Sequence, residues 1–205
     1  LHLKGEPMQQ ILQTPRLLLR PFTVQDAPAL CRLLQPPEVH RFLPLFPPRT
    51  VQETSQMIQS RFAPLEKEAL GGRYAIQERE TGALAGYVTL DPADSHDLGY
   101  ALGRSFWNKG YAQEACREVI QAAKEQGLPY LTATHDRDNV KSGAVMQRLG
   151  MRYCYSYREL WQPKNISVVF RLYQLDLQQT VVEDYPEYKN RYSWWVEPSA
   201  FHQPE

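Results

Sequence analysis

The sequence predicts a single α+β domain, and three observations support this fold class. Strand-like and helix-like patterns follow one another in the order βααβββαβαββ. Strands therefore outnumber helices, and the helices are inserted between strands without regular alternation, which is typical of α+β domains. The length of 205 residues, with 42% hydrophobic and 22% charged residues, suits one large globular domain or two small ones.

Seven segments have the apolar or alternating pattern of β-strands. The second and third are joined by Glu80-Thr-Gly82, which suits a tight turn. The last two are rich in aromatic residues and are joined by Gln162-Pro-Lys-Asn165. In chain order, we expect strands at residues 16–22, 73–80, 83–91, 97–103, 129–135, 151–161 and 166–177.

The first two helices begin at capping sequences. Thr23-Val-Gln-Asp26 resembles a capping box with Asp in place of Glu, and Pro36-Pro37 ends the helix that follows it. Thr50-Val-Gln-Glu53 is a full capping box, and its helix is expected to run to about Ala69, with Pro64 kinking or shortening it. The proline-rich segment 36–48 between them is expected to be an ordered loop.

The last two helices are expected at 111–126 and 139–149. Small and apolar residues recur at helical spacing in the first of them, and Gly127 and Gly150 follow the two segments as C-terminal caps. The tail 178–205 has no clear period, but it holds five aromatic residues between Tyr185 and Trp195. Because exposed aromatic clusters are unfavourable, we expect this tail to pack on the domain or on a second copy of the chain, so a homodimer is possible.

Charge and cysteine content exclude several classes of protein. The 23 Lys and Arg residues balance the 23 Asp and Glu residues, so we expect no nucleic-acid partner and no membrane partner. No run free of charged residues exceeds about ten residues, whereas a membrane helix needs ~20. Cys31, Cys116 and Cys154 lie far apart, so we expect no disulfide framework and no metal site. The N-terminal LHLKGEP lacks the apolar core of a signal peptide, which favours a cytoplasmic protein.

The stretch from Asp97 to Ala115 is the most informative for function. It runs from a strand through a short turn with Gly110 into a helix, whose first N–H groups suit a phosphate or pyrophosphate. Lys109 adds a positive charge there. The alternative is an ordinary strand–turn–helix with a solvated lysine, and the turn alone does not distinguish the two. Neither G-x-G-x-x-G nor G-x-x-x-x-G-K-[ST] occurs, which disfavours Rossmann and P-loop folds.

A second group of polar residues follows the next strand. Asn139 is placed to cap a helix, Ser142 lies in the first turn of that helix, and His135 lies at the end of the strand. Each has a purely structural alternative: the helix cap for Asn139, an unremarkable helical position for Ser142, and a hydrogen-bonded structural side chain for His135.

Four short blocks occur in a specific order and spacing. They are Thr14-Pro-Arg-Leu-Leu-Leu-Arg20, Leu98-Gly-Tyr100, Trp107-Asn-Lys-Gly-Tyr-Ala-Gln-Glu-Ala115, and Asn139-x-x-Ser142 with Leu149-Gly-Met151. With these blocks the chain resembles the GNAT superfamily of acetyl-CoA-dependent N-acetyltransferases, in the branch that includes ribosomal-protein N-terminal (alanine/serine) acetyltransferases. The resemblance covers residue 14 to about residue 177. Asn108 departs from the pattern, since the branch usually has a second glycine there, whereas Trp107 is within its range.

The resemblance implies a fold and a cofactor site. We expect a GNAT-like domain over 8–177, with a central mixed, mostly antiparallel sheet of about seven strands flanked by about four helices, followed by an aromatic-rich extension, 178–205. Acetyl-CoA would be the co-substrate, its pyrophosphate on backbone amides of 108–112 and its pantetheine between the strands 97–103 and 129–135. The residues implied in cofactor binding are Leu102, Gly103, Arg104, Trp107, Asn108, Lys109, Gly110, Tyr111, Ala112, Asn139 and Ser142.

The same resemblance suggests residues for direct transfer of an acetyl group to a primary amine, on a peptide or a small molecule, in a ternary complex. Asp97 stands where related enzymes place an acidic base, acting through a water. Glu159 and His135 are further candidates for the base. Ser142 matches a position implicated in protonating the departing thiolate or hydrogen-bonding its sulfur.

The acceptor and the class of function stay open at this stage. A peptide α-amine, a polyamine, an aminoglycoside and a small amino acid are all compatible with the sequence. The segment 36–48 and the aromatic residues of 151–161 (Tyr153, Tyr155, Tyr157 and Trp161) either line the acceptor pocket or belong to the core. Two alternatives to an enzyme remain, a non-catalytic acyl-CoA-binding module and an interaction protein that docks a partner through its aromatic tail.

Overall fold

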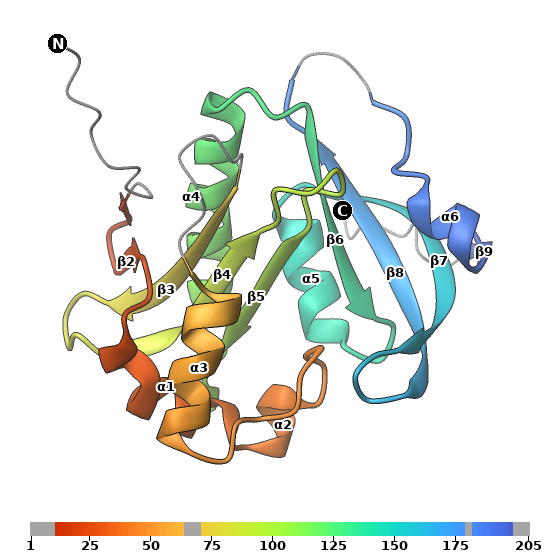
Figure 1. The fold of residues 1–205 in the computed structure, drawn as a ribbon. Coiled ribbons are helices and arrows are strands. Elements are labelled where there is room, and N and C mark those ends of the chain that lie inside the picture. Colours follow the sequence, from red (N-terminus) through yellow and green to blue (C-terminus); the bar gives the residue numbers. More distant parts are fainter. Residues whose placement is uncertain (1–10, 64–70, 179–181, 199–205) are drawn as a thin grey trace, which may run out of the picture.

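The strands form two antiparallel sheets that lie side by side (Figure 1). The computed structural model describes residues 11–63, 71–178 and 182–198. The first sheet has five strands in chain order: β1 (Leu12–Gln13), β2 (Leu17–Arg20), β3 (Gly72–Glu78), β4 (Leu84–Leu90) and β5 (Leu98–Leu102). The second sheet has the order β6-β8-β7-β9, formed by β6 (Tyr130–Asp136), β8 (Ile166–Asp176), β7 (Arg152–Trp161) and β9 (Ser193–Trp195).

Helices are inserted between these strands as expected, and the α+β fold class is confirmed. The predicted helices are α1 (Ala27–Leu34), α3 (Val51–Arg61), α4 (Tyr111–Glu125) and α5 (Val140–Arg148). Two short helices were not predicted, α2 (Pro37–His40) in the segment expected to be a loop and α6 (Glu187–Arg191) in the tail. Among the described residues, no helix combines the length and the apolarity that crossing a membrane requires.

The seven predicted strands are all present, as β2 to β8, and the sheet that they form is split between β5 and β6. The two strands run parallel and touch at a single bridge, Asp97 with Thr132, where the Thr132 N–H donates to the His96 carbonyl over 3.2 Å. Beyond this bridge the strands diverge toward their C-terminal ends (Figure 1). The sequence pattern marks each strand but does not say whether neighbours pair along their whole length.

The helix α3 ends earlier than predicted, at Arg61 and not near Ala69. A proline in the helix would clash with the carbonyl group four residues before it, and the residue preceding a proline avoids helical backbone angles. Pro64 therefore accounts for a helix that stops two residues before Ala63. The remainder of the predicted helix, from 64 to 69, lies outside the described residues.

Helix starts carry the predicted caps. The Thr50 hydroxyl accepts from the Glu53 N–H at 3.1 Å, and the Asn139 side chain accepts from the Ser142 N–H at 3.4 Å. At the start of α1, the Asp26 carboxylate accepts from the Thr23 N–H at 2.8 Å. Each cap satisfies an N–H group that would otherwise lack a partner within its helix.

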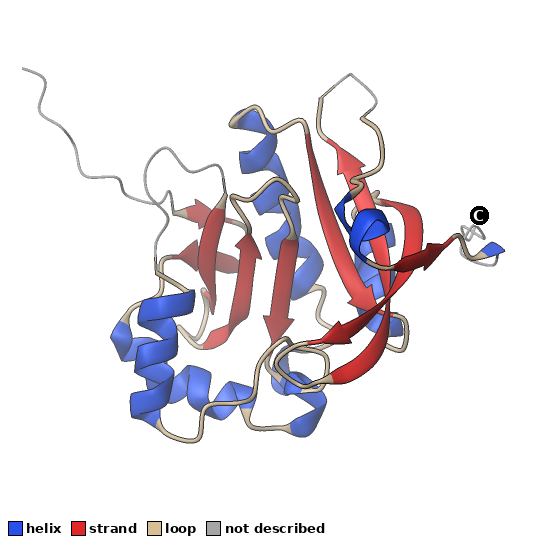
Figure 2. Ribbon diagram, turned by 45° about the vertical axis from the view of Figure 1, so that its right-hand side comes forward, coloured by secondary structure: helices blue, strands red, loops and turns tan. Residues whose placement is uncertain are grey.

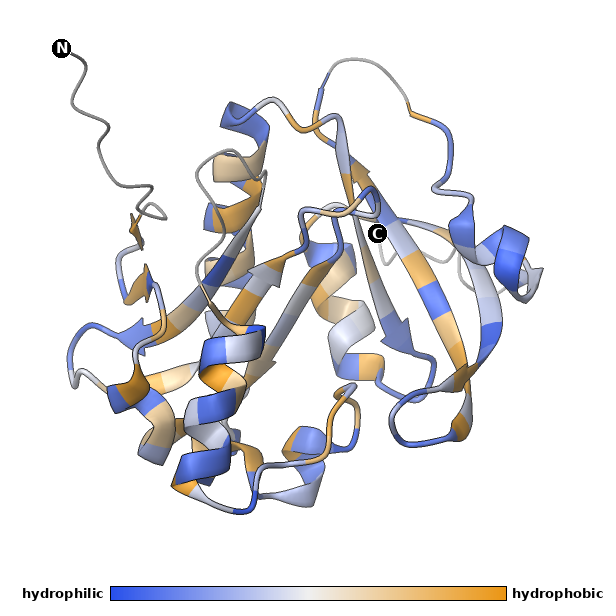
Figure 3. Ribbon diagram, viewed as in Figure 1, coloured by the Kyte–Doolittle hydropathy of each residue, from blue (hydrophilic) through white to orange (hydrophobic). Residues whose placement is uncertain are grey.

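Both faces of the two sheets are buried, and different segments of the chain cover each face. The helices α4 and α5 cover one face of both sheets (Figure 2), and α4 carries hydrophobic and hydrophilic residues in turn (Figure 3). On the other face, α1, α2 and α3 pack on the first sheet. The second sheet is covered there by the tail, whose residues 182–198 pack on β7 as the sequence predicts. The hydrophobic core is thus one cluster on the side of α4 and α5, and two separate clusters on the opposite side.

Gly86 on β4 is expected to be essential for the pairing of β4 with the end of β5. A Cβ atom at this position would lie 2.0 Å from the Ala101 carbonyl oxygen and 2.9 Å from the Leu102 Cα. Because both are backbone atoms that cannot rotate away, Gly86→Ala should lower the free energy of unfolding by about 1–3 kcal/mol or more. Urea denaturation measures this change. Gly99→Ala is the control, since its Cβ would meet only the Thr89 hydroxyl at 3.0 Å and should cost less; equal stability of the Gly86→Ala variant would contradict the expectation.

Candidate active site

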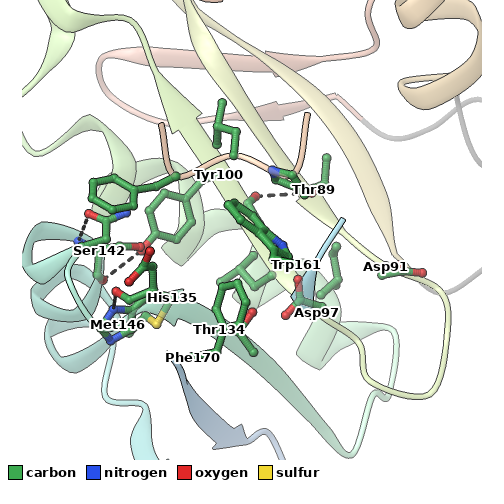
Figure 4. A pocket seen from close by; sticks show the side chains of 18 of the residues that line it. Thr89, Asp91, Asp97, Tyr100, Thr134, His135, Ser142, Met146, Trp161 and Phe170 are labelled. Atoms are coloured by element: carbon green, nitrogen blue, oxygen red, sulfur yellow. Dashed lines mark hydrogen bonds between the residues drawn. The ribbon is translucent and has the colours of Figure 1, made fainter. Parts of the chain in front are cut away.

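A cavity of about 470 Å³ opens where the two sheets separate. Its lining includes residues of β4 and β5 from the first sheet, β6, β7 and β8 from the second, the loop after α2, and the tail (Figure 4). The residues predicted from the sequence as candidates for catalysis all line it, namely Asp97, His135, Ser142 and Glu159. Residues far apart in the chain are therefore brought to one place by the divergence of β5 and β6.

The cavity reaches both faces of the sheet. Side chains alternate along a strand, so Asp97 and Tyr100 of the β5 segment point to opposite faces. Leu98 and Leu102, which share the Tyr100 side, pack with α4, whereas Ala101 on the Asp97 side packs with α1. In Figure 4, Tyr100, His135 and Ser142 lie together, and Asp97 lies apart from them near Asp91. The gap between β5 and β6 lets one cavity contact both groups.

Asp97 has the properties of a base that works near neutral pH. Burial disfavours its charged form and the nearby Asp91 adds repulsion, which together raise the pKa of Asp97 to about 7. Its Oδ1 atom is buried and has no hydrogen-bond partner among the described residues. A carboxyl group of this kind is half ionised at neutral pH and has a free oxygen to accept a proton.

Tyr100 and Ser142 form a pair of hydroxyl groups at the other side of the cavity. Their oxygens lie 2.9 Å apart, and the Tyr100 hydroxyl also donates to the Ser142 carbonyl at 3.0 Å. Burial is the main cause that raises the pKa of Tyr100 above its ordinary value, so the phenol keeps its proton. Tyr100 was not predicted as a site residue, although it lies in the Leu98-Gly-Tyr100 block that carried the family resemblance.

His135 is buried next to α5. Its Nδ1 atom lies 2.7 Å from the Asp136 carbonyl, and because a carbonyl only accepts, Nδ1 carries the hydrogen. Burial lowers the pKa of His135, and Nε2 has no partner among the described residues. An added Cβ at Gly143 would lie 2.8 Å from Nε2, so this nitrogen abuts the first turn of α5. The imidazole is therefore neutral, and its enclosed Nε2 carries no proton, so His135 stays a candidate base beside Asp97.

Glu159 lies on β7, on the side of the cavity covered by the tail. Burial raises its pKa, and the nearby Tyr192 phenol of the tail opposes this effect. Glu159 thus lines the same cavity as Asp97.

The turn before α4 has the shape predicted for an anion site. Asn108 and Gly110 both have left-handed backbone angles, with φ of 60° and 77°. Asparagine is the residue that most readily replaces glycine in this conformation, which explains how Asn108 stands at a position where the related branch has glycine. An added Cβ at Gly110 would have only the Arg16 Nη2 within reach, at 3.5 Å, so the outer side of the turn is open.

Arg16, the residue before β2, binds this turn and the start of α4. Its guanidinium donates to the Lys109 carbonyl at 2.9 Å, and it forms a salt bridge with Glu114 in the first turn of α4. A second cavity, of about 390 Å³, adjoins Gly110 between Arg16 and Arg117. The helix N-terminus, the open turn and two guanidinium groups make this region suitable for phosphate groups.

Alternate backbone groups of β5 face the gap. Asp97 accepts from the Asp91 N–H and Gly103 donates to the Ala85 carbonyl, so odd-numbered residues pair with the strand β4. The backbone groups of Tyr100 and Leu102 consequently point toward the side of β6. The Leu102 carbonyl is already bonded to the Trp107 indole N–H at 2.8 Å, which leaves the Leu102 N–H and the Tyr100 groups facing that side.

The predicted cofactor residues fall into two groups in space. Residues 102–112 form the end of β5 and the turn, and Asn139 and Ser142 begin α5 across the gap. The Gly103 N–H and carbonyl are both bonded within the protein, to Ala85 and Phe106. Within residues 11–63, 71–178 and 182–198, no group of three or more His, Cys, Asp or Glu side chains could hold a metal ion.

Comparisons with known proteins find acetyltransferases. The family model described as the acetyltransferase (GNAT) domain matches residues 16–152. YoaA of Bacillus subtilis (strain 168), named as an uncharacterized N-acetyltransferase, is 31% identical over 150 residues, which cover 71% of this chain and 84% of that protein.

Solved structures have the same fold. A GNAT-family acetyltransferase from Bacillus anthracis superposes with a TM-score of 0.70 at 21% identity, over 82% of this chain and 99% of the other. An acetyltransferase from Salmonella typhimurium, described as modifying the N-terminal serine of ribosomal protein L7/L12, superposes with a TM-score of 0.70 at 18% identity, over 82% and 100% of the two chains.

Proposed function

Because this chain belongs to the GNAT acetyltransferase family, we propose that it transfers the acetyl group of acetyl-CoA to a primary amine by direct attack inside the cavity between the two sheets. One observation carries the proposal. A carboxyl group with a pKa of about 7, Asp97, shares one cavity with the hydroxyl pair Tyr100–Ser142, and the two are on opposite faces of the sheet.

Each group has a role in this reaction. A protonated amine must lose a proton to become a nucleophile, and Asp97 can accept this proton directly or through a water. The neutral nitrogen then bonds to the acetyl carbon while the carbon–sulfur bond breaks, and the second proton that the nitrogen loses as the amide forms neutralises the departing thiolate. The backbone N–H groups that face the gap at Tyr100 and Leu102 are candidates to polarise the acetyl carbonyl, an interaction worth roughly 3–4 kcal/mol in comparable oxyanion sites. The Tyr100–Ser142 pair can donate a hydrogen bond to the departing thiolate.

Acetyl-CoA is the co-substrate, and the residues present fit it. The turn of Asn108–Ala112 would hold the pyrophosphate on backbone N–H groups, aided by Arg16 and Lys109. The pantetheine would lie in the gap between β5 and β6, with the Asn139 side chain at the start of α5 near it.

The acceptor amine would enter from the face of Asp97 and Glu159. Peptide α-amines and small-molecule amines both suit this description. Consumption of acetyl-CoA with a panel of peptides, polyamines, aminoglycosides and amino acids tests the proposal directly. We expect turnover with at least one class; acetyl-CoA binding in calorimetry with no turnover on any amine would favour a non-catalytic acyl-CoA-binding module.

Tyr100→Phe and Ser142→Ala test the hydroxyl pair. Each variant removes one member of a single hydrogen-bonded unit, so we expect each to lower kcat by roughly 10–100-fold and the double variant to lower it little further. Steady-state rates with acetyl-CoA and the best acceptor of the panel give the measurement. Losses that multiply in the double variant would mean that the two hydroxyls act separately.

A further inference from the structure

The tail is the least expected part of this site, because the family model ends at residue 152 and the tail lies beyond the last strand of the resemblance. Its aromatic side chains pack on β7 and β8. The ring of Tyr188 lies parallel to that of Tyr157, with centroids 4.6 Å apart and 4° between the planes. Tyr192 stacks on Tyr157 as well, at 5.4 Å. Such parallel stacking over a buried strand is specific packing and not a loose contact.

Ionic contacts fix the tail on both sides of these rings. Before them, Arg152 on β7 pairs with Asp184. After them, the Glu197 carboxylate accepts from the Ser156 hydroxyl at 2.7 Å and pairs with Arg171. Between the two anchors, β9 extends the second sheet by pairing with β7, so the short helix α6 is held over the sheet.

The tail faces the reacting groups directly. Tyr188 and its partner Tyr157 both line the cavity that contains Asp97. The charge of Asp97 contributes to raising the pKa of both phenols, after burial and other effects, which is consistent with their nearness to its carboxyl group. The Tyr192 phenol lies near Glu159 and opposes the rise in the pKa of its carboxyl group. The tail therefore contacts the acidic groups on the side where the acceptor would enter.

Apolar side chains oppose the tail across the cavity. Leu43 and Phe62, which belong to the cluster around α1–α3, line it from the side of the first sheet together with Phe42 of the loop after α2. Trp161 and Phe170 line it from the second sheet. The cavity is lined by four carboxyl groups and two guanidinium groups, those of Asp91, Asp97, Asp136, Glu159, Arg61 and Arg73. A cationic amine is attracted by the carboxyl groups, and aromatic walls favour an apolar or aromatic group attached to it.

We propose that Tyr188 of the tail forms an acceptor-binding wall of the site and is its specificity-determining residue, for a primary amine that carries an apolar or aromatic body. The inference rests on the proposed function, since it names the acceptor class of the same cavity. Tyr188 acts through its ring, which forms the wall and keeps Tyr157 in place.

A conjugate of both substrates tests the inference without turnover. In the probe, the sulfur of CoA is joined through a CH2–CO group to the nitrogen of phenethylamine, and its affinity is compared with that of CoA by calorimetry. We expect wild-type protein to bind the conjugate more tightly than CoA. Tyr188→Ala should weaken the conjugate about tenfold and leave the affinity for CoA unchanged, whereas Tyr188→Phe keeps the ring and should stay within about twofold of wild type.

Trp194→Ala is the matched control. Trp194 lies on the same tail and packs edge-on against Tyr155, but it is 47% exposed and does not line the cavity. Its replacement should leave both affinities within about twofold. The inference is overturned if wild type binds the conjugate no more tightly than CoA, or if Tyr188→Ala and Trp194→Ala have equal effects. Failure of the proposed function is a separate result, namely that no amine is acetylated.

Discussion

Replacing Asp97 with Asn is expected to lower kcat by about 10²–10³-fold for an acceptor amine of pKa about 10.4, and by less than about tenfold for an α-amine of pKa about 7.8. At pH 7 the first amine is neutral about once in 2,500 molecules and the second about once in seven. The amine of higher pKa therefore depends far more on a general base than the α-amine does. Steady-state rates of the variant and of wild type on one amine of each kind give the comparison.

The pH dependence of the two proteins separates a catalytic effect from a structural one. The pKa of about 7 predicts that wild-type activity falls as the pH drops below 7 and Asp97 becomes protonated. In Asp97→Asn, the pH profile should follow the protonation of the acceptor amine alone, without the component that titrates near pH 7. Equal, small losses on both amines would instead assign the proton transfer to Glu159, His135 or water.

The free energy of unfolding gives an independent check, because Asp97→Asn should raise stability at high pH although it lowers activity. Because the folded protein binds a proton at Asp97 more tightly than the unfolded chain does, stability is lost as the pH rises from the unfolded pKa toward 7. Asparagine carries no such charge. Urea unfolding should therefore show that Asp97→Asn is more stable than wild type at pH 8, with a difference that shrinks toward pH 4.

Gly110→Asp is expected to weaken acetyl-CoA binding by about 100-fold or more, since a carboxylate at the open turn repels phosphate and its side chain fills the space left for it. The backbone at Gly110 is left-handed, so any side chain also adds strain. Calorimetric titration with acetyl-CoA measures the loss.

The other end of the same helix provides the control. Gly127 has a left-handed φ of 84°, and nothing lies within 4 Å of an added Cβ. Gly127→Asp thus introduces the same charge and similar strain away from the turn, and it should bind acetyl-CoA as wild type does. Undiminished binding by Gly110→Asp would remove the turn from the cofactor site.

Local features of the fold could be predicted from the sequence because short-range patterns encode them. Capping at Thr50 and Asn139, and the glycines after α4 and α5, depend on residues within one or two helical turns. Pro64 marked the weakness of α3, which ends at Arg61, before the proline and short of the predicted end near Ala69.

The split between β5 and β6 could not be predicted in this way. Both strands have ordinary apolar patterns, and whether they pair beyond Asp97 and Thr132 depends on contacts between distant segments. For the same reason, Tyr100 was visible only as part of a block, since its contact with Ser142 joins residues 42 positions apart. The tail was predicted to pack by its composition, but the stacking of Tyr188 on Tyr157 is a tertiary contact that composition does not encode.

A crystal structure of the protein with acetyl-CoA is the most direct test of the central claim, that acetyl transfer takes place in the gap between β5 and β6. We expect the pantetheine to lie between these strands. The acetyl carbonyl should lie within hydrogen-bond distance of a backbone N–H of Tyr100 or Leu102, with the sulfur beside the Tyr100–Ser142 pair and the acetyl group facing the side of Asp97. An acetyl group found outside the cavity, or a gap closed by pairing of β5 with β6, would contradict the claim.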